Sequence, residues 1–269
     1  MKKYVLDLIV TSVEHVSDKH VLIKLTHAEA LPEMRPGQFV EIRVDNSSDT
    51  FLRRPISINS VDYQKNELWL LVAKVGSGTR RLALLKNGEI LNCVLPLGNG
   101  FTVPESPISE GVVKAEKNAS KILLVGGGVG VAPLLYMGKV LKDNGFAPIY
   151  LLGARSAGDI LLLDEFRKYG SVYITTEDGS MGEKGFVTNH SILNEGGFSQ
   201  ISVCGPKPMM VAVAKFAKMK NYYCEVSLEN KMACGLGACL CCVENTKHGN
   251  VCVCKDGPVF NINDLSWQI

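Results

Sequence analysis

The sequence has little net charge and no long apolar run, and each shortage excludes a broad class of protein. Its 269 residues carry 29 Lys and Arg against 27 Asp and Glu, a net charge of +2. No electrostatic attraction to nucleic acid or to a membrane surface is therefore expected. No uninterrupted apolar stretch approaches the length of a bilayer span. Residues 1–10 turn apolar after two lysines, but Asp7 interrupts them and no small-residue cleavage site follows. We therefore predict a strand there, no membrane partner and a cytoplasmic protein.

Internal repeats and low-complexity tracts are also lacking, and the composition is that of an ordinary globular protein, with 46% apolar and 21% charged residues. A chain of this length can bury a sizeable core without disulfides, and two or three domains are expected. The cysteines, in contrast, are clustered: six of the nine lie within residues 234–254. In a cytoplasmic chain such crowding indicates metal ligands rather than disulfides.

Residues 1–103 are predicted to form a small antiparallel β-barrel or sandwich. Residues 40–44 alternate apolar side chains with Glu41 and Arg43, which is the period of a half-buried strand. Turn-forming residues separate further runs of the same kind. These runs occupy residues 21–26, 55–58 and 67–75.

Residues 104–120 are polar and rich in turn formers, which is typical of a linker. Residues 121–223 alternate continuous apolar runs with amphipathic segments, and this alternation predicts a doubly wound parallel sheet. Residues 224–269 are rich in Gly and Cys and have little room for a core, so this segment is expected to need a metal staple. Strands are expected at 122–125, 149–152, 172–175 and 201–204, and helices after the glycine cluster, near 164–169 and over 208–219.

The cysteine loop has the spacing of plant-type ferredoxins. Cys234, Cys239 and Cys242 form a C-x4-C-x2-C pattern, which ligates a [2Fe–2S] cluster when a fourth cysteine lies further along the chain. Gly235 and Gly237 allow unusual dihedral angles in the loop. They also let amide N–H groups approach the sulfur atoms, which tunes the potential of a cluster.

The spacing alone decides neither which cysteine is the fourth ligand nor which metal the loop binds. Cys252 and Cys254 are both candidates for the fourth ligand, and Cys241 is a further surplus thiol. A surplus thiol can be a plain small hydrophobe. Zinc prefers paired C-x2-C knuckles and matches the spacing poorly, but a zinc-stapled interaction module without catalytic activity is the alternative of another class.

A glycine cluster at 126–133 follows an apolar strand and precedes a helical segment. In that context glycines let the backbone approach a pyrophosphate, and the helix N-terminus supplies N–H donors. Pro133 suits the first helical turn, although a tight strand-to-helix turn also uses glycine. Arg155 and Ser156 follow the second strand, where the adenosine ribose is usually recognised. An arginine there can accept the 2′-phosphate of NADP, or the pair is a solvated loop, so the preference for NAD stays open.

In this order the motifs resemble the ferredoxin-NADP⁺ reductase superfamily over nearly the full length of the chain. Arginine, serine and glycine positions match, while Ile56 stands where the superfamily's flavin motif has a tyrosine. The matching stretches are RPIS (54–57) for R-x-Y-S, GSGT (76–79) for a second flavin-binding stretch, GVGVAP (128–133) for G-x-G-x-x-P, and CGP (204–206) near the nicotinamide.

The resemblance implies that FAD binds to the barrel and NAD to the α/β domain. Arg54 would neutralise the FAD pyrophosphate through charge-assisted hydrogen bonds, and Ser57 would lie at the flavin N5. Gly78 and Thr79 would donate to phosphate. The remaining implied cofactor contacts are Pro55, Ile56, Leu71, Val72 and Ala73 for the flavin, and Gly128, Gly130, Pro133, Cys204, Gly205 and Pro206 for the nucleotide.

The cluster loop, MACGLGACLCCVE with a later VCKDGPVF, is similar to that of the electron-transfer subunits of NAD-dependent dihydroorotate dehydrogenases. This resemblance implies Cys254 as the fourth ligand beside Cys234, Cys239 and Cys242. It also implies an FMN-containing catalytic partner subunit, a heterotetramer of two plus two subunits, and a place in pyrimidine biosynthesis. Electrons would pass from the partner through [2Fe–2S] and FAD to NAD⁺, so no catalytic residue for dihydroorotate is expected in this chain. The alternative within the class is the small FAD and [2Fe–2S] subunit of an NADH-dependent ferredoxin:NADP⁺ oxidoreductase, a sulfide dehydrogenase or a hydrogenase.

Overall fold

The chain forms two compact units that interleave along the sequence. The computed structural model describes residues 2–105, 108–109, 112–113 and 121–269. The first unit contains Met1–Gly100 and Leu228–Val259, and the second contains Phe101–Ser227 and Phe260–Ile269. The sequence predicted a third, separate cluster domain over 224–269. In the structure most of that segment belongs to the same unit as the barrel, because its own apolar residues are too few to form an independent core.

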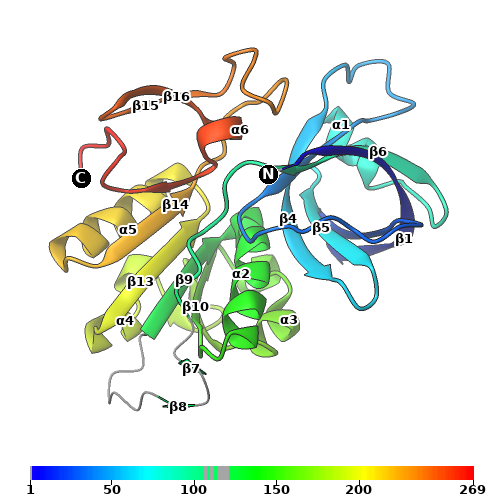
Figure 1. Cartoon of the computed structure of the whole chain (residues 1–269). Helices are drawn as coiled ribbons and strands as arrows, with labels where there is room; N and C mark the ends of the chain where they lie inside the picture. Colours follow the sequence, from blue (N-terminus) through cyan, green and yellow to red (C-terminus); the bar gives the residue numbers. More distant parts are fainter. Residues whose placement is uncertain (1, 106–107, 110–111, 114–120) are drawn as a thin grey trace. The chain divides into compact units, whose positions relative to one another are not determined.

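Six strands of the first unit close into an antiparallel barrel in the order β1-β2-β5-β4-β3-β6 (Figure 1). The predicted runs at 21–26 and 55–58 lie within these strands, and the run at 67–75 covers β5 and the two residues after it. Apolar side chains on alternate positions, such as Leu8 and Val10, fill the interior with no exposed surface. The strands are β1 Tyr4–Ser17, β2 His20–Thr26, β3 Phe39–Ile42, β4 Arg54–Asp62, β5 Glu67–Ala73 and β6 Ile90–Leu97.

Strand β3 departs from the alternation that the sequence predicted. Glu41, expected on the exposed face of a half-buried strand, has no exposed surface. The face that carries it is covered by the cysteine loop, since a Cβ atom on Gly235 would lie 2.6 Å from Glu41 Cγ. The covering residue comes from the far end of the sequence, so local periodicity could not reveal it.

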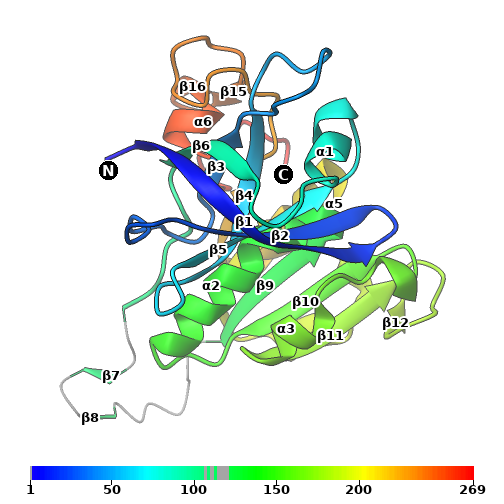
Figure 2. The same cartoon turned by 90° about the vertical axis from the view of Figure 1, so that its right-hand side faces the viewer.

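The carboxyl-terminal part of the first unit is a small hairpin and one helical turn. Strands β15 (Val243–Thr246) and β16 (Gly249–Cys252) pair antiparallel, and α6 (Val253–Asp256) follows directly. Figure 2 shows the three elements grouped together. Asn99, just after β6, fastens the turn to the barrel: its side-chain amide donates to the carbonyls of Lys255 and Asp256, at 3.3 and 3.0 Å. A six-residue helix, α1 (Ser77–Leu82), follows β5.

The second unit is the predicted parallel sheet with helices on both faces. Its seven strands are ordered β12-β11-β10-β9-β13-β14-β17, and Figure 1 shows α2 and α3 on one face and α5 on the other. The chain order reverses between β9 and β13, which makes that point the topological switch of the sheet. The strands are β9 Lys121–Gly127, β10 Ile149–Ala154, β11 Ser171–Thr176, β12 Glu183–Lys184, β13 Phe198–Cys204, β14 Tyr223–Ser227 and β17 Val259–Asn261; the helices are η1 Gly128–Val131, α2 Ala132–Asp143, η2 Ala157–Asp159, α3 Leu163–Arg167, η3 Val187–Asn189, α4 Ile192–Glu195 and α5 Lys207–Met219.

The predicted linker at 104–120 lies mostly outside the described residues. Two short strands within it, β7 (Ile108–Ser109) and β8 (Val112–Val113), pair antiparallel. Of the helices in the described part of the chain, none combines the length and apolar character needed to cross a membrane.

Candidate functional site

The predicted flavin stretch forms the open end of an otherwise buried strand. In β4, residues 54–57 are all half-buried, while the four residues that follow are fully buried. The neighbouring strand β5 continues beside it, since Ile58 of β4 pairs with Leu70 of β5. Of the predicted contacts on β5, Leu71 and Val72 are buried and Ala73 is half-buried. An apolar ring laid on this partly open surface would complete its burial. The residues present therefore fit a flavin, although the predicted contacts of the individual side chains remain predictions.

Arg54 and the GSGT stretch lie together, as the predicted pyrophosphate site requires. A Cβ atom on Gly78 would lie 2.9 Å from the Arg54 Nε, so only glycine leaves room for the guanidinium. Arg54 Nη1 donates to the carbonyls of Leu52 and Arg53, at 2.7 and 3.2 Å. The Thr79 hydroxyl accepts the N–H groups of Val75 and Gly76, both at 3.0 Å. This hydroxyl thus stabilises its own turn, and phosphate donation by Gly78 and Thr79 stays a prediction.

In the cysteine loop, backbone N–H groups converge on the Cys234 sulfur. The N–H of Leu236 donates to Cys234 Sγ at 3.3 Å, and the N–H groups of Cys239 and Ala238 add to its effect. These donors lower the pKa of Cys234 to about 6, against an ordinary value of 9.0. A sulfur that already receives amide hydrogen bonds is prepared to act as a thiolate ligand.

The two candidates for the fourth ligand differ in their hydrogen bonds. The sulfur of Cys254 accepts the N–H of Gly237 at 3.1 Å, and the N–H of Cys254 donates to Cys242 Sγ at 3.3 Å. The Cys252 thiol instead donates to the Gly237 carbonyl at 3.8 Å. Burial raises the pKa of Cys254 to about 12, so this buried thiol ionises only beside a strong positive charge, which bound iron supplies. The geometry thus favours Cys254 over Cys252.

The four predicted ligands differ in their access to solvent. Cys242 and Cys254 are buried, Cys234 is intermediate and Cys239 is exposed, as is the surplus Cys241. The described residues contain no group of three or more His, Cys, Asp or Glu side chains arranged to hold a single metal ion. The fit to a cluster therefore rests on thiols that accept amide N–H groups, a pattern that suits iron–sulfur ligation.

In the second unit the two predicted nucleotide motifs meet at the switch point of the sheet. Strands β9 and β13 are neighbours, and Gly126 pairs with Cys204 at their carboxyl ends. A Cβ atom on Gly130 would lie 2.5 Å from Gly205 Cα, so the two loops touch through their backbones. Ligands of open α/β sheets bind at this position. Pro133 lies in the first turn of α2, as predicted.

At the end of β10, Arg155 is exposed and an acidic residue stands nearby. The Ser156 hydroxyl donates to the Asp159 carboxylate at 3.3 Å. An acidic residue after the second strand of such a sheet is the kind of group that reads the adenosine ribose of NAD. The preference between NAD and NADP was left open by the sequence, which offered Arg155 and Ser156 here.

The barrel with its flavin stretch, the parallel sheet with its nucleotide loops and the cysteine loop define a flavin- and iron–sulfur-dependent NAD reductase. A solved NADH-dependent reduced ferredoxin-NADP oxidoreductase has this fold, with 28% identity and a TM-score of 0.82 over 97% of this chain and 90% of that one. A cytochrome P450 reductase from Amycolatopsis shares the fold alone, with a TM-score of 0.65 and 24% identity over 81% of this chain and 66% of that one.

Family models and close relatives are more specific. Residues 229–266 match the iron–sulfur cluster binding domain of dihydroorotate dehydrogenase B, and residues 124–215 match an oxidoreductase NAD-binding domain. The dihydroorotate dehydrogenase B (NAD(+)) electron transfer subunit of Shouchella clausii is 37% identical over 96% of both chains. The corresponding subunit of Lysinibacillus sphaericus is 39% identical over 91% of this chain and 94% of its own. The chain belongs to the family of dihydroorotate dehydrogenase B electron transfer subunits, and its cofactors are FAD, a [2Fe–2S] cluster and NAD.

Proposed function

We propose that this chain is the electron-transfer subunit of an NAD-dependent dihydroorotate dehydrogenase in pyrimidine biosynthesis. The observation that carries the proposal is the cysteine loop, in which backbone N–H groups already point at the sulfur atoms of Cys234 and Cys254. Its sequence also falls within the match to the cluster-binding domain of dihydroorotate dehydrogenase B. The barrel and the parallel sheet supply the flavin and nucleotide sites of the same electron path.

Each part of the chain has a separate task in this function. When bound, the cluster exchanges single electrons, the flavin exchanges one or two, and NAD⁺ accepts a hydride. The cysteine loop holds its ligand sulfurs within reach of amide donors, which favours their thiolate form. Arg54 offers a positive charge to a pyrophosphate, and the Gly130–Gly205 contact shapes the backbone at the nucleotide loops.

The oxidation of dihydroorotate belongs, in this proposal, to a catalytic partner subunit that carries FMN. We propose an assembly of two plus two subunits, as the family resemblance implies, and a cytoplasmic location. The location is supported by the crowding of six cysteines into residues 234–254, which indicates metal ligands rather than disulfides.

The test is anaerobic purification of the chain alone, followed by measurement of FAD, iron and acid-labile sulfide and of NADH-dependent dye reduction. We expect a brown protein with visible absorption, one FAD, two irons and two sulfides per chain, active with dye and inactive with dihydroorotate. Addition of the catalytic subunit should confer dihydroorotate oxidation coupled to NAD⁺. A colourless protein that contains zinc, or robust dihydroorotate oxidation by the chain alone, would refute the proposal. Coupling to ferredoxin and NADP⁺ instead would favour the ferredoxin:NADP⁺ oxidoreductase alternative.

A further inference from the structure

Glu41 is a carboxylic acid buried where no described group binds it. Glu41 has no exposed surface, and neither of its carboxyl oxygens has a hydrogen-bond partner among the described residues. A buried polar group without a partner costs free energy. Such a group in a native fold calls for a reason, and a ligand site is one of the usual ones.

The position of Glu41 places it between two predicted cofactor sites of the first unit. In the antiparallel register of β3 and β4, Glu41 pairs with Pro55 of the predicted flavin stretch. On its other side the side chain reaches the cysteine loop: a Cβ atom on Gly235 would lie 2.6 Å from Glu41 Cγ and 3.0 Å from its Oε1. Gly235 has a φ of +66° and directly follows the predicted ligand Cys234.

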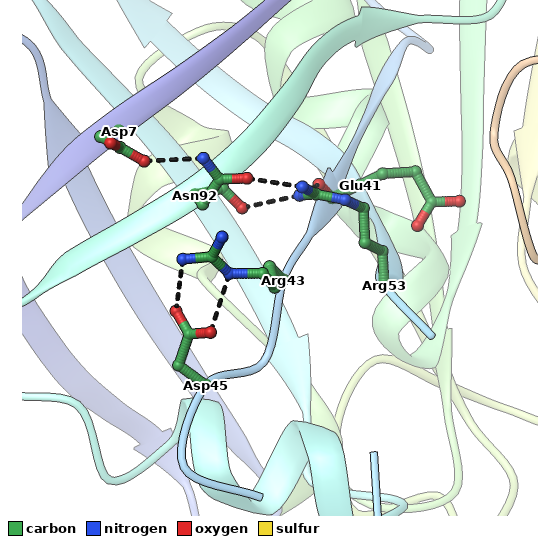
Figure 3. Close-up of polar contacts among 6 residues, drawn as sticks. All are labelled: Asp7, Glu41, Arg43, Asp45, Arg53 and Asn92. Atoms are coloured by element: carbon green, nitrogen blue, oxygen red, sulfur yellow. Dashed lines mark hydrogen bonds and ion pairs between the residues drawn. The ribbon is translucent and has the colours of Figure 1, made fainter. Parts of the chain in front are cut away.

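The neighbouring Arg53 makes no hydrogen bond to this carboxyl group. Arg53 donates through Nη1 to the carbonyls of Glu41 and Asn92, at 3.2 and 3.0 Å, and through Nη2 to the Asn92 side chain at 2.5 Å. Asn92 in turn donates to Asp7 at 2.7 Å. Figure 3 shows the guanidinium engaged in this network, with the Glu41 carboxyl group extended away from it and joined by no contact.

We propose that Glu41 is a positioning residue of the cluster site, which supports the Gly235 turn and whose charge lowers the reduction potential of the bound cluster. The inference rests on the proposed function, because it requires the cluster in this loop. Reduction adds a negative charge to the cluster, and a buried carboxylate that receives no hydrogen bond opposes that step.

The test is a potentiometric titration of the cluster, followed by its electron paramagnetic resonance signal, in the full chain loaded with both cofactors. The wild type and the variants are measured at the same alkaline pH, because high pH favours the ionised form of a carboxyl group. For Glu41→Gln we expect cluster reduction to become on the order of tenfold more favourable, a rise of about 59 mV for a one-electron couple. Glu14→Gln is the control, because it makes the same chemical change at an exposed carboxylate of β1 paired with Lys24. It should leave the potential unchanged.

Glu41→Asp separates charge from shape and serves if Glu41→Gln does not retain its cluster. It keeps the charge while shortening the side chain, so its cluster potential should stay close to that of the wild type. A wild-type potential in Glu41→Gln, or an equal rise in Glu41→Asp, would overturn the inference. Absence of iron from the wild-type protein would instead refute the proposed function, so the two failures are distinguishable.

Discussion

At the residue scale, Tyr150 of β10 is packed so tightly in the core of the second unit that its neighbour on α2 must be glycine. The side chain has no exposed surface and packs edge-to-face on Phe166, with ring centroids 4.8 Å apart. Its hydroxyl has no hydrogen-bond partner among the described residues. A Cβ atom on Gly138 of α2 would lie only 1.5 Å from that hydroxyl. Gly138 is therefore required by the tyrosine ring, and the hydroxyl itself adds no stabilising contact.

Replacing Tyr150 with phenylalanine should leave stability unchanged or increase it by about 1 kcal/mol, because the substitution removes a buried hydroxyl without a partner. Thermal unfolding of the nucleotide-binding unit, followed by calorimetry, checks this. Gly138→Ala is the matched comparison and should lower the unfolding temperature clearly, since its methyl group overlaps the ring. A marked destabilisation by Tyr150→Phe would mean that the hydroxyl has a partner after all.

Residue-scale reasoning from the sequence found the cofactor stretches but not the environment of single charges. The glycine and cysteine motifs could be predicted because their residue types and spacing are themselves the signal. In the structure Gly130 lies close to Gly205, and the N–H of Gly237 donates to the Cys254 sulfur. Glu41 was assigned to the exposed face of its strand. Its burial depends on Gly235, which is remote in sequence, and no local pattern carries that information.

At the scale of elements, the cysteine loop and α6 form one ligand-holding structure. The N–H of Val253 donates to the Cys242 carbonyl at 3.0 Å, and the N–H of Cys254 donates to the Cys242 sulfur. The start of the helical turn thus fixes Cys254 against the loop. Cys252, one residue before the turn, donates its thiol hydrogen to the Gly237 carbonyl instead.

Cys254→Ser should therefore lose the cluster, whereas Cys252→Ser should retain it. Iron and acid-labile sulfide, measured on anaerobically purified variants, should fall below about a tenth of the wild-type content in the first and stay near it in the second. The paired design controls for general damage to the loop, because both substitutions replace sulfur with oxygen within the same short segment. The reverse pattern would make Cys252 the ligand.

The individual strands could be predicted from the sequence, but their pairing could not. The runs at 21–26 and 67–75 were recognised by their period and their flanking turns; they correspond to β2 and β5, and the second prediction ran two residues past the end of its strand. The pairing of β3 with β6 and the closure of the barrel join segments distant in sequence. Such pairings follow from global packing rather than from local propensity. The strand pattern therefore left a barrel or a sandwich open, and it was the family resemblance that implied the barrel, which the structure confirms.

At the scale of the whole molecule, the chain crosses between its two units more than once. Residues 228–259 belong to the barrel unit, whereas β14 (Tyr223–Ser227) and residues 260–269 belong to the nucleotide unit. The N–H of Ile262 donates to the Cys224 carbonyl at 3.1 Å, which holds the final segment to β14. The order of residues 228–259 should therefore depend on the cluster, whereas β14 and residues 260–269 should not. The sequence had predicted that the whole segment 224–269 needs the metal.

Cys239→Ser is expected to remove the cluster and to loosen residues 228–259, since this segment has few apolar contacts of its own and gains order from metal binding. Hydrogen exchange followed by mass spectrometry should show faster exchange there, while β9 and β14 keep their protection because they are buried strands of a sheet that contains no cluster ligand. Cys241→Ser, which changes an exposed surplus thiol of the same loop, is the control and should exchange like the wild type. If iron is lost without faster exchange in 228–259, the barrel packing alone holds the segment. If β14 loosens as well, the two units unfold as one and the division of the chain into separately stable parts is wrong.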